Sequence, residues 1–504
     1  MDVNAVAGRL YEQAADTIVV FGAEGGELAG VAQAVDEALS GALRELIEGG
    51  DFSGKSGQVA VLYPRGAIPA KRVIAVGLGQ RDRLTVDTLR RAAAQAAQKA
   101  RDLKARTMAA APEVIDGLDI AQAAEALAEG ALLGLYQYHG QKTSDAPEAL
   151  PELFTIVVEG RDLEAAQPGV AAGAAIAAGV NLTRDLVNLP PNICTPAYLA
   201  ETAQRVGAQV GLKVEVLERR QMESLGMGAL LGVAQGSETP PRFIIMEHNA
   251  DKAGELDTIV LVGKAVTFDT GGYSLKSGEG MAGMKADMGG GGAVIGAMQV
   301  IGTLRISLHV VGLIPAVDNM VSGKAYRPQD VLRASNGVTI EIISTDAEGR
   351  LLLADALAFA SRYKPAAVVD IATLTGACVV ALGTVAAGLF SSDDNLRDAL
   401  LHSAEQTGEK VWPLPLWPEY DKAIESQTAD VKNSGGRYGG AATAAAFLTH
   451  FVDYPAWAHL DIAGVAGIEG MNSNNDNPYV PGKGATGFGV RLMTDFARRW
   501  SPVE

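Results

Sequence analysis

Short apolar runs alternate with longer runs of helical spacing through the first third of the chain. The short runs are rich in β-branched residues, and the longer ones place alanine and leucine on one helical face. The predicted strands are residues 17–21, 59–63, 73–76 and 154–158, and the predicted helices are residues 31–47 and 86–103. Strands that alternate with helices indicate an α/β layer structure.

The same alternation resumes after residue 195, with longer elements. The predicted strands are residues 213–217, 242–247, 258–262, 307–314, 339–343 and 367–371, and the predicted helices are residues 198–210, 293–302, 351–362, 396–407 and 441–452. Another apolar helix over residues 170–186 ends before Pro190-Pro191, because proline ends helices.

A chain of 504 residues is too long for one ordinary domain. We therefore predict two α/β domains, each a mainly parallel or mixed sheet flanked by helices. The first covers residues 1–165, and the larger C-terminal catalytic domain covers residues 166–504. Residues 166–188 would form a helix that bridges the two.

Composition narrows the range of partners and compartments. A net charge of −17 argues against nucleic acid as the main partner, because basic patches supply most of the affinity for phosphate backbones. Two cysteines in so long a chain are no disulfide framework, and we expect buried thiols in a reducing compartment. The first residues lack a basic segment followed by an apolar run, and no uninterrupted apolar stretch suits a membrane span. We expect a soluble, cytoplasmic protein with no membrane partner.

Charged residues interrupt the apolar pattern sharply in two segments. The first carries Lys264, Asp269, Lys276 and Asp287 among glycines, and the second is Thr345-Asp346-Ala347-Glu348-Gly349-Arg350. Each follows an apolar strand, and ligands of open α/β sheets bind where strands end. If the two strands are neighbours, four carboxylates meet there, namely Asp269, Asp287, Asp346 and Glu348.

Four carboxylates in one place repel one another unless cations neutralise them. Two divalent ions with oxygen ligands, such as Mg, Mn or Zn, fit this need and would activate a water molecule as nucleophile. The alternative is a set of ordinary surface salt bridges. That reading suits Asp346 and Glu348 alone, but it fits poorly for both segments among glycines. The sequence therefore predicts a two-metal hydrolase.

Other motifs give little information about function. There is no HExxH and no GxSxG motif. The segment 77–82 begins like a dinucleotide loop but lacks the third glycine, so a plain strand-to-helix turn is expected. The glycines 289–292 precede no Gly-Lys-Ser/Thr and are expected to let a helix start close to the metal site. His459 alternates with Asp461 on a predicted strand and is expected to be a hydrogen-bonded core histidine.

The two charged segments resemble the signatures of the leucyl aminopeptidase (cytosol aminopeptidase) family. The resemblance continues through Asn188-Leu-Pro-Pro-Asn192, residues 326–328, residues 370–376 and residues 457–464, and so covers the second domain. It implies a metal-dependent aminopeptidase that releases leucine and other hydrophobic N-terminal residues from peptides with a free N-terminus.

The resemblance also implies a role for each charged residue. Asp269 and Glu348 would bridge two metal ions, Lys264 and Asp287 would complete the tighter site, and Asp346 the looser one. Lys276 would stay charged and polarise the scissile carbonyl. Arg350, with Leu374 packed nearby, would hold a bicarbonate ion that acts as general base for the metal-bound water. The metals would be Zn or Mn, with Mg or Co possible.

The resemblance further implies a pocket for the first side chain of the peptide, lined by Met284, Thr373, Gly376, Ala463 and Ala466. Ala466 is smaller than the methionine that some members carry, which favours a roomier pocket that accepts Phe and Met besides Leu. The family assembles as a homohexamer, so the resemblance implies the same here.

Two alternative functions fit the sequence less well. One is a different two-metal hydrolase, such as an amidase or phosphoesterase, which the shortage of histidine and the presence of Lys276 with Arg350 argue against. The other is DNA binding in addition to catalysis, which the acidic net charge argues against.

Overall fold

The computed structural model describes residues 1–25, 28–112, 118–144, 148–467 and 476–501. The chain forms two compact units, one of residues 1–178 with 476–481 and one of residues 179–475 with 482–504. Helix α5 (Leu163–Asn188) passes from the first unit into the second. The boundary that we placed between residues 165 and 166 stays a prediction.

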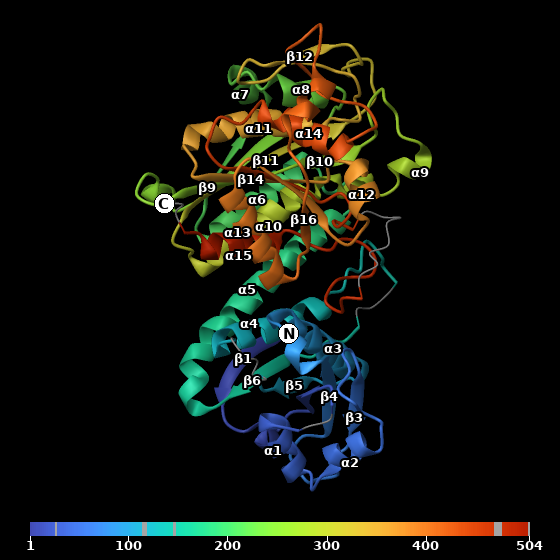
Figure 1. Ribbon diagram of the computed structural model, residues 1–504, viewed down its shortest axis with the longest axis vertical. Helices are drawn as coiled ribbons and strands as arrows, with labels where there is room; N and C mark the ends of the chain where they lie inside the picture. Colours follow the sequence, from blue (N-terminus) through green and yellow to red (C-terminus); the bar gives the residue numbers. More distant parts are fainter. Residues whose placement is uncertain (26–27, 113–117, 145–147, 468–475, 502–504) are drawn as a thin grey trace. The chain divides into compact units, whose positions relative to one another are not determined.

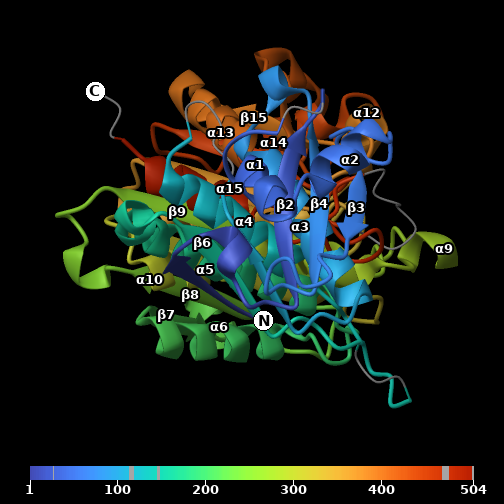
Figure 2. The ribbon, with the colours of Figure 1, turned by 90° about the horizontal axis from the view of Figure 1, so that it is seen from below.

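The first unit holds a six-stranded mixed sheet in the order β1-β6-β5-β2-β4-β3, in which only β3 runs antiparallel to its neighbour. Figure 2 shows β2, β4 and β3 side by side. The strands are β1 (Asp2–Ala7), β2 (Thr17–Ala23), β3 (Val59–Leu62), β4 (Arg72–Gly79), β5 (Thr107–Ala110) and β6 (Leu153–Val158). The helices are α1 (Gly30–Ala38), α2 (Ala42–Glu48), α3 (Val86–Asp102) and α4 (Ile120–Gly134).

Alternate residues of β2 face opposite layers of helix, as the two-residue repeat requires. Val19 and Phe21 belong to the core formed with α3 and α4, while Ile18 and Val20 belong to the core formed with α1 and α2. The single helix predicted over residues 31–47 is wrong. Gly41 adopts a φ of 89°, which a helix cannot include, and it separates α1 from α2.

The second unit is built on a nine-stranded sheet, with the order β16-β15-β18-β14-β9-β11-β8-β7 and with β10 paired only to β11. Its strands are β7 (Lys213–Leu217), β8 (Arg242–His248), β9 (Thr258–Gly263), β10 (Ala265–Asp269), β11 (His309–Asn319), β14 (Ala367–Ala372), β15 (Ala387–Ser391), β16 (Val411–Pro413) and β18 (Trp457–Asp461). A separate three-stranded sheet holds β12 (Val331–Arg333), β13 (Thr339–Glu341) and β17 (Val431–Lys432).

Helices cover both faces of the large sheet, α8, α11 and α14 on one face and α6, α10, α13 and α15 on the other (Figure 1). The described helices of this unit that follow α5 are α6 (Pro196–Val210), α7 (Arg219–Ser224), α8 (Gly228–Ala234), α9 (Gly278–Met281), α10 (Gly289–Leu304), α11 (Gly349–Ala360), α12 (Gly376–Leu382), α13 (Asp394–Thr407), α14 (Gly440–Thr449) and α15 (Val490–Arg499). The central strands are buried on both faces, which explains their continuous apolar sequences. The predicted α/β fold class is confirmed.

One helix of the described chain, Gly160–Asn188, is long and apolar enough to cross a membrane by length and composition. Its apolar window is 67% buried inside the protein, which is typical of a helix that packs in a core. The helix also contains Arg184 and Asp185 near its C-terminal end.

Candidate active site

Neighbouring strands of the large sheet separate at Lys264. Strand β9 ends one residue before it, and β10 begins one residue after it and follows β11 alone. The backbone N–H of Lys264 donates to Ile371 O at 3.1 Å, and its carbonyl accepts from Gly291 N at 2.7 Å. The lysine backbone is therefore held between strand β14 and the first turn of α10, and its side chain starts where the strands separate.

Glycines allow helices to approach this point. A Cβ on Gly290 would stand 2.1 Å from Ile371 O, and one on Gly349 would stand 2.5 Å from the Cε of Lys264. A side chain on Gly290 would push α10 away from β14, and one on Gly349 would displace the side chain of Lys264. The expectation that glycines 289–292 let a helix begin near the site is confirmed.

The predicted charged residues converge around the two lysines. The Nζ of Lys264 lies 2.7 Å from Asp287 Oδ1 and 2.9 Å from Glu348 Oε1. The Nζ of Lys276 lies 2.9 Å from Asp269 Oδ2 and also pairs with Asp346. Oxygen atoms of Asp269, Asp346 and Glu348 lie within 4.8 Å of one another. The six residues form one continuous cluster.

Asp269, Asp287 and Glu348 are almost completely buried, whereas Asp346 is open to solvent. Burial raises the pKa of both Asp269 and Asp287, and the neighbouring Glu348 raises each further. Burial by itself lowers the pKa of Lys264, but Asp287 and Glu348 outweigh it, so the pKa is raised. The amine of Lys264 therefore carries its charge in this arrangement.

The cluster has more negative than positive charge, because two ammonium groups face four carboxylates. The Oδ2 atom of Asp287 is buried and has no hydrogen-bond partner among the described residues. A buried carboxylate oxygen without a partner is costly unless a cation reaches it. Hard oxygen donors at this spacing fit divalent metal ions, and a deprotonated lysine amine can add a nitrogen ligand.

The strand before the second charged segment is not a neighbour of the strand before Lys264, which was the condition under which convergence was predicted. Strand β13 belongs to the separate small sheet. The two segments meet instead through Asn319, at the end of β11. Its Nδ2 donates to Asp269 Oδ1 at 2.8 Å and to Thr345 O at 2.9 Å. Sequence reasoning missed this residue, although a polar side chain that ends a long apolar strand was a usable signal.

Arg350, in the first turn of α11, is buried and makes no ion pair with a carboxylate in the described part of the chain. Its Nη1 donates to Asn433 O at 2.8 Å, and its Nε has no described partner. Burial lowers the pKa of Arg350 to about 10, against the opposite effect of Glu348 and Asp461. A buried guanidinium with free donors is suited to a small planar anion.

Asn433 was also missed by sequence reasoning. Its side-chain oxygen accepts the N–H of Ile343 at 2.8 Å, and its Nδ2 donates to Ser344 O at 2.7 Å. Its backbone oxygen holds Arg350. One loop residue thus fixes both the strand that leads into the charged segment and the guanidinium that ends it. No periodicity marks such a residue.

The predicted pocket residues lie on the ends of β14 and β18 and on the 3-10 helix Met284–Met288. Thr373 touches the cluster directly, since its hydroxyl donates to Asp287 Oδ1 at 2.7 Å and its carbonyl accepts from Lys264 Nζ at 2.8 Å. Thr373 and Ala466 both lie within 4 Å of the Cβ position of Gly289, which places them beside each other. Ala463 is tied to Leu374 through Asp461. Gly376 begins α12 and has open space at its Cβ position.

His459 is a core residue, as predicted. It is fully buried on β18, and its Nδ1 lies 2.5 Å from Asp370 Oδ1. Asp370 also accepts from the indole N–H of Trp457 at 2.7 Å. Burial lowers the pKa of His459, but Asp370 outweighs burial and raises it.

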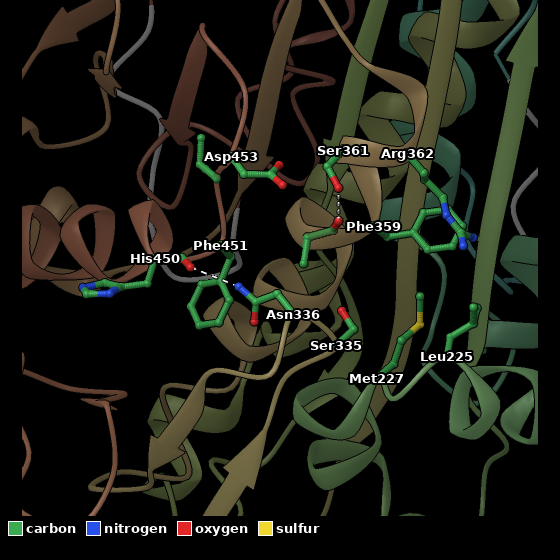
Figure 3. A pocket seen from close by; sticks show the side chains of 12 residues that line it. Leu225, Met227, Ser335, Asn336, Phe359, Ser361, Arg362, His450, Phe451 and Asp453 are labelled. Atoms are coloured by element: carbon green, nitrogen blue, oxygen red, sulfur yellow. Dashed lines mark hydrogen bonds between the residues drawn. The ribbon is translucent and has the colours of Figure 1, made fainter.

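A cavity of about 400 Å³ lies elsewhere in the second unit, beside Ser361 and Arg362 (Figure 3). Its polar groups are largely satisfied within the protein. Asn336 donates to the carbonyl of His450, and Ser361 donates to that of Ala358. None of the predicted site residues lines it.

Comparisons with known proteins agree with this geometry. Residues 181–494 match the catalytic domain of the cytosol aminopeptidase family, and residues 18–145 match the N-terminal domain of that family. A probable cytosol aminopeptidase of Roseiflexus castenholzii is 47% identical over 92% of this chain and 95% of its own length. One from a Geobacter species is 45% identical over 92% of this chain and 93% of its own.

Solved structures show the same relationship. A tomato leucine aminopeptidase mutant superposes with a TM-score of 0.86 at 34% identity, covering 99% of this chain and 96% of its own. The bottromycin maturation enzyme BotP in complex with Mn gives a TM-score of 0.83 at 36% identity, covering 96% of this chain and 99% of its own.

Proposed function

The chain belongs to the cytosol aminopeptidase family, and on that premise we propose that it removes hydrophobic N-terminal residues, leucine foremost, from peptides with two metal ions. Membership makes it a peptidase that depends on metal. The observation that carries the two-metal proposal is the buried cluster. Oxygens of Asp269, Asp346 and Glu348 lie within 4.8 Å of one another, and Asp287 is joined to them through Lys264.

We propose the metal ligands that the family resemblance implies. Asp269 and Glu348, whose oxygens lie within 4.8 Å of each other, would be shared by the two ions. Lys264 and Asp287 would complete the site on the buried side, and Asp346 the site on the open side. When bound, two such ions supply a Lewis acid for the peptide carbonyl and a water of lowered pKa as nucleophile. Zn or Mn are the ions we propose, with Mg or Co as further candidates.

Lys276 is the residue that we assign to the substrate carbonyl. Its ammonium group pairs with Asp269 and Asp346, and its side chain is only 17% exposed. Burial alone lowers the pKa of Lys276, but the carboxylates outweigh it and raise the pKa, so the group keeps its charge. A fixed positive charge in a largely dry site stabilises an oxyanion as it forms.

We assign Arg350 to the binding of a small anion, bicarbonate in our proposal. The Nε has no described partner, and the guanidinium pairs with no described carboxylate. It can therefore bind a planar anion through two hydrogen bonds. Leu374, whose backbone is anchored by Asp461, would pack against it. Bicarbonate would serve as general base, a role for which the described cluster offers no free histidine.

The first side chain of the peptide would enter between Met284, Thr373, Gly376, Ala463 and Ala466. Two alanines and a glycine leave room for large apolar side chains, so we propose that Phe and Met are accepted besides Leu. We also propose a homohexamer in the cytoplasm, in keeping with the family resemblance.

Hydrolysis of Leu-p-nitroanilide tests the proposal. The metal-loaded protein is expected to cleave it, to leave the N-acetylated analogue intact, and to lose activity in a chelator. Equal cleavage of the acetylated compound would instead indicate another two-metal amide hydrolase. Phe- and Met-p-nitroanilide, compared with the Ala compound by kcat/KM, test the pocket, and a strong preference for Ala would contradict it.

A further inference from the structure

A short segment near the C-terminus belongs to the first unit. Residues 476–481 are part of that unit, although residues 179–467 and 482–501 belong to the second. The most buried side chain of the segment is Tyr479, which is 1% exposed and lies outside any helix or strand. A large aromatic side chain fixes the segment that carries it, because removing it from its site leaves a cavity. Tyr479 therefore anchors the segment in the first unit.

The anchor of Tyr479 is a buried network of charged groups. Its hydroxyl donates to Asp87 Oδ1 at 2.5 Å, in the first turn of α3. Asp87 also accepts from Arg90 at 3.0 Å, and the guanidinium of Arg90 lies 6.0 Å from the centre of the Tyr479 ring. Arg90 pairs in turn with Glu129 of α4 at 2.8 Å. Such a network tolerates little displacement, because a buried group that loses its partner is left uncompensated.

The backbone of the segment is held by a second contact with α3. The Nε2 of Gln98 donates to Pro478 O at 2.7 Å and to Gly134 O, at the end of α4, at 3.1 Å. Within the segment, the backbone N–H of Tyr479 donates to Asn477 Oδ1 at 3.3 Å. Two separate points of α3 therefore define where residues 477–479 lie.

The chain returns from this anchor directly to the proposed substrate pocket. The backbone N–H of Thr486 donates to Ala466 O at 3.2 Å, and its hydroxyl donates to Val465 O at 2.6 Å. Ala466 is one of the proposed pocket residues and lies beside Thr373, whose hydroxyl contacts Asp287. Thr486 thus holds the backbone of a pocket wall.

The residue before Thr486 is tied to another wall. Ala485 N–H donates to Asn188 Oδ1 at 3.0 Å, and the carbonyl of Asn188 accepts from Lys285 Nζ at 3.1 Å. Lys285 directly follows Met284, a second proposed pocket residue. Only residues 480–484 separate the anchor from these contacts, and a chain advances by at most about 3.6 Å per residue. So short a link passes a displacement of the anchor on to the pocket.

We propose that Tyr479 is a positioning residue for substrate specificity. Its anchor on α3 holds Thr486, and through it Ala466, in place, so the first unit sets the shape of the pocket for the first side chain of the peptide. The effect falls on how well that side chain binds, because Tyr479 contacts none of the proposed metal ligands. This inference rests on the proposed aminopeptidase function.

Steady-state kinetics of the metal-loaded, full-length protein with Leu- and Ala-p-nitroanilide test the inference. Tyr479→Phe removes the hydroxyl that donates to Asp87 and keeps the ring. The preference for Leu over Ala in kcat/KM is expected to fall about 10-fold, because one methylene group in a well-formed pocket is worth roughly 10- to 200-fold. The fall should come from a raised KM for the Leu compound, with kcat within about 2-fold of wild type.

Gln98→Ala provides an independent variant, because it removes the hydrogen bond to Pro478 and leaves Tyr479 in place. It is expected to lower the same preference about 3-fold. The matched control is Tyr11→Phe, which removes another tyrosine hydroxyl of the first unit, one that accepts from Arg9 at 2.6 Å. This control is expected to keep the wild-type preference. If Tyr479→Phe does not fold, Gln98→Ala decides the question alone.

The outcomes separate the two claims. If wild-type protein does not cleave Leu-p-nitroanilide, the proposed function fails. If it does, and the variants lose thermal stability with an unchanged preference for Leu, Tyr479 is only structural and the inference is overturned. A lowered preference that comes with a lowered metal content or a changed oligomeric mass would also overturn it, because the metal site or the assembly would then be the cause.

Discussion

The carboxylate of Asp461 accepts two hydrogen bonds from Thr375, one from its hydroxyl at 2.6 Å and one from its backbone N–H at 3.3 Å. The same carboxylate accepts the N–H groups of Leu374 and Ala463, each at 3.2 Å. Asp461 is completely buried. It therefore joins the ends of β14 and β18, which carry most of the proposed substrate pocket.

Replacing Asp461 by asparagine turns one acceptor oxygen into a donor that faces N–H or O–H groups. We expect kcat/KM for Leu-p-nitroanilide to fall about 10- to 100-fold, the range typical of groups that support a metal site. We also expect a loss of roughly 1–3 kcal/mol in the free energy of unfolding. Metal content should stay at the wild-type value. Asp398→Asn, at an exposed position, is the control, and a metal-depleted D461N protein would contradict the assignment.

Asp287 is expected to be needed for one of two metal ions. Its Oδ1 accepts from Lys264 and Thr373, and its Oδ2 is the buried oxygen without a described partner. In Asp287→Asn, elemental analysis should show about one metal ion per subunit in place of two, and kcat should fall at least about 100-fold. Retention of both ions at full occupancy would remove Asp287 from the ligand set.

Lys276 is expected to act on kcat more than on KM. Lys276→Met keeps much of the side-chain length but removes the charge beside the scissile carbonyl. Loss of one charge-stabilising donor typically costs about 100- to 1000-fold in kcat. Saturation kinetics with metal-loaded protein provide the measurement. A variant with unchanged kcat and raised KM would indicate that Lys276 only binds substrate.

Neither cysteine is expected to react with thiol reagents in the folded protein. Cys194 and Cys378 are unpaired and buried, and burial raises the pKa of each thiol to about 12. At pH 8 the thiolate fraction is therefore about 1 in 10,000. Titration with a disulfide reagent should count no thiol in native protein and two after denaturation. A fast-reacting native thiol would show that one of these pockets opens readily.

Asp355 is expected to make stability depend on pH. It accepts the N–H groups of Leu230 and Ser335, and burial raises its pKa from 3.8 to about 6. The folded state then holds a proton that the unfolded state has released, so this contribution is present below pH 4 and is lost as the pH rises through 6. A shift of this size corresponds to about 3 kcal/mol.

The measurement is the free energy of unfolding of wild type minus that of Asp355→Asn, taken by denaturant titration from pH 4 to 7. The difference should shrink up to about pH 6 and then stay level. Carboxylates of the metal cluster titrate in both proteins and cancel. The exposed variant Asp398→Asn should show a constant difference from wild type over the same range.

The long elements could be predicted well because their buried positions produce a clear apolar pattern in the sequence. Strand β9 is buried at every position and reads as an unbroken apolar run, and α3 shows a continuous alanine face. Short elements carry no such pattern. Strands β5, with four residues, and β12, with three, were not predicted, because so few residues cannot show a reliable repeat. The break between α1 and α2 at Gly41 was not predicted, because the helical spacing of apolar residues continues through it.

The convergence of the charged residues was predicted for the case that the two preceding strands are neighbours, a condition that the structure does not meet. Lys264 and Glu348 do meet, but through the glycines of α10 and α11 and through Asn319, not because their strands are neighbours. Asn319, Asn433 and Asp461 each act through several hydrogen bonds, most of them to groups far away in the sequence. Such contacts depend on positions in space, and one sequence contains no periodic trace of them.

The two lysines of the cluster also affect whether folding or metal binding comes first after synthesis. A small zinc domain whose ligands repel one another stays unfolded until its metal arrives. Here Lys264 and Lys276 each bridge two of the carboxylates and neutralise half of their charge. We therefore propose that the chain can fold before it binds the ions assigned above, so that the supply of metal would govern how many molecules are active and not how many fold.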